Sequence, residues 1–284
     1  MAYNKYDNSE LRSLQMVELN IARIFADICE RYHLRYFMVG GTMLGAIRHK
    51  GFIPWDDDMD VAMPRPDYEK FLDIVTDELP AGYSFLNYRQ GGKYLRYFSR
   101  IVDKNVAVVN ASNTVKITEN AWLDIFPLDG MPRTAPGRMI HFWHMTVWRF
   151  FYHASCFRQL VNLRRPGRPK YQQLLIKFMQ KTHIGANLDT RKLMKRIEKL
   201  LLKYPYDSST HMISMFGSYM NREIVDKKLL GEGKMYPFET LMLRGPEQYD
   251  AFLTHFFGDY MTPPKDIDKD KHNIEKIEYT RKDA

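Results

Sequence analysis

The sequence predicts an α+β protein, α/β-like in the order of its elements, in which a mixed sheet is flanked by helices. An amphipathic helix over 9–33 is followed by an apolar strand at 36–39, a turn, a short helix and a second strand at 59–63. Residues 82–88 and 94–103 then alternate apolar and polar side chains, which is typical of half-buried strands. With 284 residues, of which 45% are hydrophobic, the chain can bury a substantial core.

The remaining elements follow from apolar spacing and from proline positions. A helix is predicted over Pro66–Leu79, because proline is favoured in the first turn and the apolar residues after it recur at helical spacing. The run Trp122–Leu128 predicts a further apolar strand. We also expect a strand at Tyr236–Leu243 with a helix after it.

A glycine pair lies between the first strand and the short helix. Gly40 and Gly41 are expected to form a turn in which the backbone can approach a ligand closely. Thr42 is the candidate cap of a helix over Thr42–Arg48, and the N-terminus of such a helix favours an anion. The pattern therefore predicts a seat for a phosphate group.

Positive side chains accompany this turn. Arg48, His49 and Lys50 follow the short helix and are candidate phosphate partners. Arg100, on the strand predicted at 94–103, could also reach a phosphate, and the alternative is a surface arginine on an edge strand.

A run of aspartates comes next and leads directly into an apolar segment. Asp58 and Asp60 are two residues apart, so in a strand over 59–63 they lie near one face of the sheet, with Asp56 just before it. Clustered carboxylates repel one another, and a hard divalent cation relieves this best. We therefore expect Mg²⁺, or Mn²⁺ in its place, at this position. The alternative is a hairpin turn with a solvated acidic loop.

Asp124 is the candidate for a third acid that faces the metal. It interrupts the apolar run Trp122–Leu128, and an unpaired carboxylate inside such a strand costs several kcal/mol, so it requires a cation or strong donors. Backbone N–H groups are the alternative partners. The predicted metal ligands are thus Asp58, Asp60 and Asp124.

Positive charge is concentrated in one segment of the chain. Between Met131 and Lys203 there are 16 lysines and arginines and two acids, although the whole chain carries only +8. This predicts a catalytic core over 1–130, a basic, aromatic-rich and mostly helical insertion over 131–205, and a C-terminal part over 206–284 that completes the core. The basic helices could dock on an anionic membrane surface or form ordinary core with a solvated face. Nucleic acid is not among the expected partners.

The chain carries few signals of secretion or membrane insertion. Cys29 and Cys156 do not form a disulfide framework or a zinc motif by their spacing, so buried thiols in a reducing compartment are expected. The N-terminus is polar, and no apolar run approaches about 18 residues. We expect a cytoplasmic protein, peripheral to the inner face of the cell membrane if the basic helices dock there.

Three stretches resemble the LicD family of phosphotransferases. They are GGTMLGAIRHKGFIPWDDDMDVAMPRPDYEKF, AWLDIFPLDG at 121–130 and YPFETLMLRGPEQYDAFLTHFFGDYMTPP at 236–264. That family decorates cell-surface glycans with phosphocholine and is similar to fukutin-type transferases. The resemblance implies a nucleotidyltransferase-type mixed sheet, in which a glycine turn precedes a strand with Asp-x-Asp and a later strand supplies a third carboxylate.

The resemblance also implies an activity. The expected reaction is metal-dependent transfer of phosphocholine from CDP-choline to a hydroxyl of a glycan, such as lipopolysaccharide or teichoic acid, or of its lipid-linked precursor. Asp56 or Asp124 could take the proton from that hydroxyl. Trp55, Trp122 and Tyr97 lie near the motifs and are candidates to hold the choline by cation–π attraction, or they are plain core residues.

Other functions remain open at this stage. Ribitol- or glycerol-phosphate transfer would use the same acids, and a true nucleotidyltransferase would release pyrophosphate instead of CMP. A membrane-surface binding protein without catalysis is the alternative outside enzymes.

Overall fold

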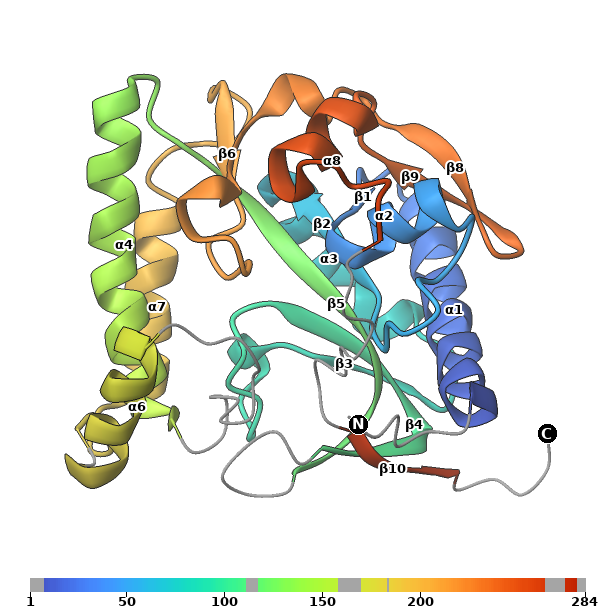
Figure 1. Cartoon of the computed structure of the whole chain (residues 1–284), viewed down its shortest axis with the longest axis horizontal. Helices are drawn as coiled ribbons and strands as arrows, with labels where there is room; N and C mark the ends of the chain where they lie inside the picture. The colour runs from blue at the N-terminus through green and yellow to red at the C-terminus, as the bar shows by residue number, and fades with distance from the viewer. Residues whose placement is uncertain (1–7, 111–116, 158–169, 183, 264–273, 280–284) are drawn as a thin grey trace.

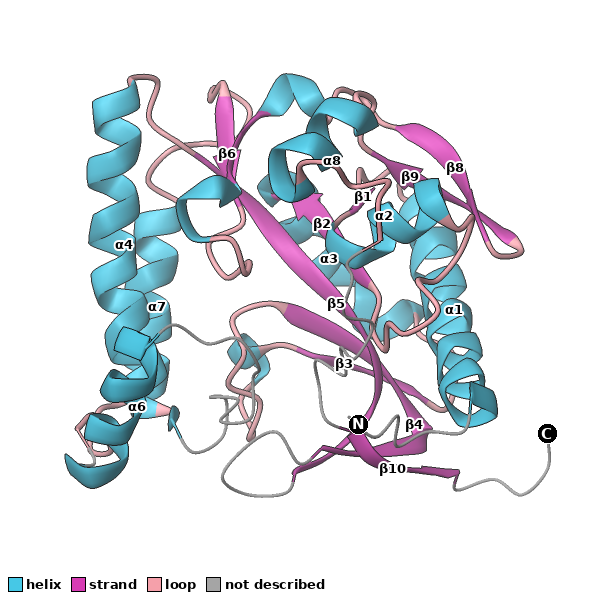
Figure 2. Cartoon of the chain, viewed as in Figure 1, coloured by secondary structure: helices cyan, strands magenta, loops and turns pink. Residues whose placement is uncertain are grey.

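The structure is a computed structural model, and it describes residues 8–110, 117–157, 170–182, 184–263 and 274–279. A strongly twisted mixed sheet runs through the molecule, with helices on its flanks (Figures 1 and 2). The predicted α+β class, with a mixed sheet and flanking helices, is therefore confirmed.

The main sheet is built around one long strand. Its central path runs in the order β1, β2, β5, β4, β10, and β3 pairs with β4 while β6 joins β5 to β7. Among the described strands of this sheet, β2 pairs with β5 in parallel and the other pairings are antiparallel. The strands are β1 Phe37–Met38, β2 Asp60–Pro64, β3 Tyr83–Leu86, β4 Ser99–Asn110, β5 Ile117–Gly130, β6 His211–Ile213, β7 Ile224–Asp226 and β10 Ile274–Tyr279.

Helices α1 (Asn8–Arg31) and α3 (Arg65–Glu78) supply much of the main core. Their apolar faces join buried residues of β1, β2, β4 and β5 in one hydrophobic cluster. A buried ion pair also ties α3 to the end of β5: the Arg65 guanidinium donates to both carboxylate oxygens of Asp129, at 2.7 and 2.8 Å. These contacts fix the strands that carry the acidic residues.

The basic segment forms a second helical layer, at the left of Figure 1. Helices α4 (Ala135–Ser155) and α7 (Thr190–Leu201) pack against each other around their own hydrophobic cluster, and α6 (Lys170–Thr182) completes the segment. None of the described helices is long and apolar enough to cross a membrane. Cys29 and Cys156 are free and buried, as predicted.

Several boundaries differ from the prediction. The expected strand at Tyr236–Leu243 is a hairpin of β8 (Lys234–Phe238) and β9 (Leu241–Gly245), followed by α8 (Tyr249–Phe257). The strand predicted at 94–103 begins only at Ser99. The described residues also form three short 3₁₀ helices: η1 (Tyr88–Gln90), η2 (Met220–Glu223) and η3 (Lys227–Leu229).

Candidate active site

The parallel pairing of β2 with β5 brings two of the predicted acids together. Asp60 is the register partner of Asp124, and the Asp124 N–H donates to the carbonyl of Met59 at 3.0 Å. Neighbouring strands are about 4.8 Å apart and register partners project to the same face, so these two carboxylates lie side by side. Asp60 and Asp124 are more than sixty residues apart in the sequence, and this strand pair makes them neighbours in space.

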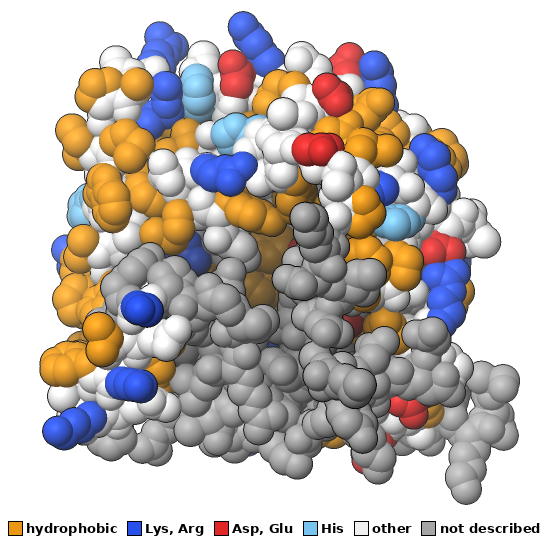
Figure 3. Space-filling model, viewed as in Figure 1, with side chains coloured by type: hydrophobic (Ala, Val, Ile, Leu, Met, Phe, Trp, Pro, Cys, Tyr) orange, Lys and Arg blue, Asp and Glu red, His pale blue; other side chains and the backbone are white. Residues whose placement is uncertain are grey.

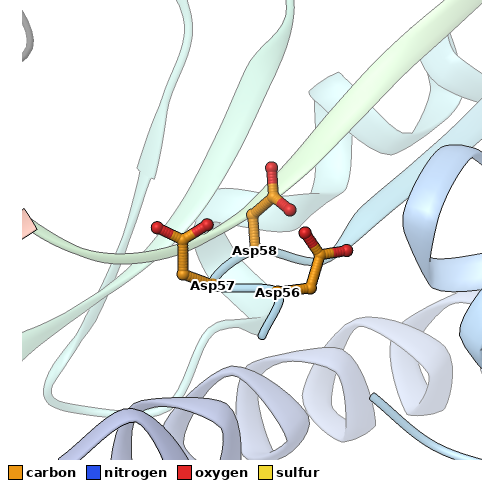
Figure 4. Close-up of side chains that lie close together, drawn as sticks. All are labelled: Asp56, Asp57 and Asp58. Atoms are coloured by element: carbon orange, nitrogen blue, oxygen red, sulfur yellow. The ribbon is translucent and has the colours of Figure 1, made fainter. Parts of the chain in front are cut away.

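A cluster of three carboxylates precedes β2. Asp56, Asp57 and Asp58 project from the loop toward a common side (Figure 4). An oxygen of each lies within 4.8 Å of an oxygen of the others, and Asp56 and Asp57 are buried. Asp57 was not among the predicted site residues. If side chains alternated here as they do in a strand, Asp57 would lie on the face opposite to Asp58 and Asp60. The loop is not an extended strand at this point, so that alternation does not apply.

Helix α2 (Gly40–Arg48) points its N-terminus at these acids. A Cβ at Gly40 would lie 3.2 Å from an Asp60 oxygen, and a Cβ at Gly41 would collide with an Asp56 oxygen. The two glycines therefore leave the space that the carboxylates occupy. The positive end of the helix dipole stabilises negative charge here.

The prediction for this turn needs two corrections. Gly40 and Gly41 are the first residues of α2 itself, not a turn before it, and the helix therefore starts two residues earlier than expected. Thr42 is not the cap: the N-cap position is Val39, which makes no side-chain bond. The Thr42 hydroxyl instead accepts a hydrogen bond from the Asp60 N–H at 2.7 Å, and so ties α2 to the start of β2.

Helix α1 contributes two polar residues that the sequence analysis missed. The Gln15 amide donates to the carbonyl of Asp56 at 2.9 Å and so holds the acidic loop. One turn further along, Glu18 is fully buried and neither carboxylate oxygen has a hydrogen-bond partner. Burial, followed by the negative charges of Asp58 and then of the neighbouring acids, raises the pKa of Glu18 well above its usual range. In the sequence, Glu18 is a charged residue at a core position of an otherwise regular amphipathic helix. That mismatch was the one available sequence signal for its role.

Arg100 lies beside Asp124 on the neighbouring strand. Its Nε and Nη2 donate to the two oxygens of Asp124 at 2.5 and 3.3 Å, and Nη1 donates to Glu119 at 3.1 Å. Burial lowers the pKa of Arg100, but Asp124 and Glu119 outweigh it and raise the value above normal. Arg100 thus occupies a buried position within the sheet, not a surface edge, and it is the strong donor that an acid inside an apolar strand requires.

The predicted basic group lies at the other end of α2. Arg48 donates to the carbonyl of Tyr260 at 3.0 Å and lies 6.0 Å from the ring of Trp55, while the rings of His49 and Trp55 are 6.2 Å apart. Burial lowers the pKa of both Arg48 and His49. Lys50 is exposed. The structure therefore gathers these residues around Trp55, at the C-terminal end of the helix whose N-terminus faces the acids.

The other two aromatic candidates are part of the packed interior. Trp122 is 1% exposed and lies 4.3 Å from the Arg100 guanidinium, and Tyr97 is 2% exposed and stacks between Tyr88 and Phe216. They support the site from behind and do not offer a ligand a free ring face.

The acids fit a divalent cation, judged by the chemistry of the groups present. Three clustered aspartates, Asp56, Asp57 and Asp58, lie near the paired Asp60 and Asp124, and the fully buried Glu18 carboxyl has no donor in the described structure. Such a concentration of negative charge is costly without a counter-ion, and carboxylate oxygens are the ligands that Mg²⁺ and Mn²⁺ prefer.

Comparison with known proteins identifies chains that are similar in sequence. Residues 33–157 match the family described as LicD/FKTN/FKRP, nucleotidyltransferase domain. The chain is 28% identical to the lipopolysaccharide cholinephosphotransferase LicD of Haemophilus influenzae over 277 residues, which cover 94% of this chain and 97% of that protein. It is also 32% identical to an uncharacterized protein of Rickettsia typhi, over 28% of this chain and 25% of that one.

Glu18 gives a prediction about stability. The raised pKa means that the folded, metal-free protein keeps a proton on Glu18 at pH values where the unfolded chain has lost it. The free energy of unfolding must then fall as pH rises from the ordinary glutamate value toward the raised one. We expect Glu18→Gln to be more stable than the natural protein in EDTA at about pH 8, with a gap that narrows toward about pH 5.

Urea unfolding at both pH values measures this difference. The control is Glu30→Gln, an exposed glutamate of the same helix, which should leave the pH dependence unchanged. A Glu18→Gln variant that is less stable than the natural protein at both pH values would show that the carboxylate has a stabilising partner.

Proposed function

On the premise that residues 33–157 make the chain a member of the LicD family, we propose that it is a phosphotransferase that moves phosphocholine from CDP-choline to a glycan hydroxyl. The observation that carries the proposal is the pairing of Asp60 with Asp124 beside the acidic loop and the N-terminus of α2. Phosphoryl transfer needs charge neutralisation and placement more than covalent chemistry, and this arrangement offers both.

A Mg²⁺ or Mn²⁺ ion is part of the proposal. Asp58 and Asp60 would hold it, with Asp56 and Asp124 adjacent and Glu18 behind them. When bound, such an ion neutralises the diphosphate of the donor and polarises its phosphoryl oxygens. One or two ions are compatible with the number of carboxylates.

The chain's own residues would do the rest. The first N–H groups of α2, at Gly40, Gly41 and Thr42, lack partners within the helix and can orient a phosphate oxygen. Asp56 or Asp124 would accept the proton of the incoming hydroxyl, and two nitrogens of Arg100 hold Asp124 in place. Arg100 would act through Asp124, because its nitrogens donate to Asp124 and Glu119.

The carried group is inferred from the relative in Haemophilus influenzae, whose name specifies cholinephosphate and lipopolysaccharide. Acids that hold a metal and a diphosphate do not distinguish choline from ribitol or glycerol. A donor screen with CDP-choline, CDP-ribitol, CDP-glycerol and CTP distinguishes these cases, because transfer of a phosphoalcohol releases CMP and nucleotidyl transfer releases pyrophosphate.

The central prediction concerns Asp58. With CDP-choline, Mg²⁺ and a glycan acceptor, Asp58→Asn should release CMP at least about 100-fold more slowly, because several kcal/mol of charge stabilisation are lost. Circular dichroism should show an unchanged fold. The control Asp27→Asn, an exposed aspartate on α1, should keep normal turnover. Undiminished CMP release by Asp58→Asn would remove this residue from the proposed metal site.

A lipid-linked acceptor would require contact with a membrane surface, and α4 offers a suitable face. Large apolar side chains stand out from it at helical spacing, among them Ile140 at 72%, Trp143 at 57% and Val147 at 52% exposure. Figure 3 shows hydrophobic side chains along this edge of the molecule, with Lys and Arg at its lower end. Exposed Lys177 and Lys181 on α6 would favour anionic headgroups.

We therefore expect the protein to cosediment with vesicles that contain phosphatidylglycerol, and binding should weaken as salt screens the charges. The double variant Ile140→Ser with Trp143→Ser should remain mostly in the supernatant. Met242→Ser, which removes a similarly exposed apolar residue from β9, is the matched control. Equal sedimentation of all three proteins would exclude α4 as the docking face.

A further inference from the structure

A cavity of about 130 Å³ opens directly beside the acids. Gly40 and Asp60 form part of its wall, and the remaining lining is mainly apolar. Figure 3 shows the face of the molecule hollowed near its middle, with hydrophobic side chains at the bottom of the hollow. The rings that line the cavity are Phe126, Phe216, Tyr219, Phe252 and Phe256.

Three of these rings form one aromatic wall. Phe252 and Phe256 lie on successive turns of α8 with centroids 5.0 Å apart, and Tyr219 lies 5.4 Å from Phe256. Packing of each ring against the next holds the wall in place. Such ring faces carry negative charge density and attract a desolvated cation.

One carboxylate belongs to the same cavity. Glu223, at the end of η2, is 8% exposed, and one of its oxygens accepts a hydrogen bond from the Tyr219 N–H at 3.0 Å. Gly217 packs against this carboxylate so closely that a Cβ there would collide with it. Burial raises the pKa of Glu223 to about 7, although the Tyr219 N–H and Arg149 act in the opposite direction.

Arg149 does not neutralise Glu223 through a direct bond in the described structure. Its guanidinium donates to the backbone carbonyls of Met215 and Gly217, at 2.7 and 3.3 Å. The cavity therefore combines aromatic rings with a buried acid that accepts a hydrogen bond from a backbone N–H. A cation of low hydration matches both features.

The size and polarity of the cavity further limit the kinds of ligand that it can bind. A cavity of ~150 Å³ is known to accommodate benzene, which is similar in size to a trimethylammonium group. A polyol such as ribitol needs a hydrogen-bond partner for every hydroxyl, and it fits less well because most lining side chains are apolar and the side-chain hydroxyls are those of Ser214, Ser218 and Tyr219. A phosphate group would be repelled by Glu223.

We propose that this cavity binds the quaternary ammonium group of the donor, with Glu223 as its counter-charge and the rings of Tyr219, Phe252 and Phe256 around its methyl groups. The inference rests on the proposed function and names the subsite that would select choline over other alcohols. Since Gly40 and Asp60 belong to the cavity wall, an ammonium group held here leaves the attached phosphate next to the acids. None of Trp55, Trp122 and Tyr97 lines this cavity.

The test is an NMR titration of the full chain with two ligands that differ only in charge. Choline and its uncharged isostere 3,3-dimethylbutan-1-ol have the same shape, so a preference for choline of about tenfold or more reports the cation site. Glu223→Gln should abolish that preference and leave binding of the isostere and of CMP unchanged. The control Glu232→Gln, an exposed glutamate, should behave as the natural protein.

Equal affinity of the natural protein for choline and the isostere would overturn the proposal without any variant. An undiminished preference in Glu223→Gln would overturn the role of this carboxylate. The proposed subsite and the proposed function can fail separately. If the protein releases CMP from CDP-ribitol or CDP-glycerol but not from CDP-choline, it is a phosphotransferase that lacks this choline subsite. If the protein binds choline in preference to the isostere but releases no CMP from any donor, the subsite is supported and the proposed phosphotransferase activity is contradicted.

Discussion

The parallel pairing of β2 with β5 is the constraint on which the rest of the site depends. It alone brings Asp60 and Asp124 next to each other, because each strand by itself carries only part of the acidic group. The residues that follow the acids in the paired segments, 61–64 and 125–128, are apolar, and most of them are buried in the main core. Burial of the apolar residues of these two strands therefore supplies the free energy that holds Asp60 and Asp124 in place.

The elements around this pair compensate for its negative charge in different ways. Helix α2 directs its N-terminus at Asp56 and Asp60, and glycines at its first two positions make that approach possible. Arg100 balances Asp124 from β4. Glu18 has no donor among the described residues, and a fully buried carboxyl without a partner beside these acids is the strongest structural sign that a cation belongs here.

Much of this arrangement could be predicted from the sequence, because the strongest signals are local. The order of elements from α1 to α3 follows from apolar periodicity, and the acids stand out against the apolar residues beside them. The strand register of Asp60 and Asp124 is a long-range property, so the sequence could indicate it only through the family resemblance. The contribution of Glu18, the start of α2 at Gly40 and the hairpin at 234–245 were missed, since each depends on packing with distant segments.

The aromatic residues illustrate the same limit. Trp122 and Tyr97 are close to the motifs in sequence, yet Trp122 is buried in a hydrophobic cluster and Tyr97 is buried between two other rings. The rings that surround the cavity beside Asp60 come largely from Phe216, Tyr219, Phe252 and Phe256, far along the chain. Their proximity to the acids results from the return of β6, β7 and α8 to the main sheet, which no local pattern reveals.

The central claim is that Asp58 and Asp60, beside the pairing of β2 with β5, hold a divalent cation against a nucleotide phosphate. The most direct measurement is an anomalous-scattering map from crystals grown with Mn²⁺ and CMP. The account predicts a manganese peak ligated by Asp58 and Asp60, with an oxygen of the CMP phosphate as a further ligand. A well-ordered CMP with no manganese at these carboxylates, or with manganese held elsewhere, would contradict it.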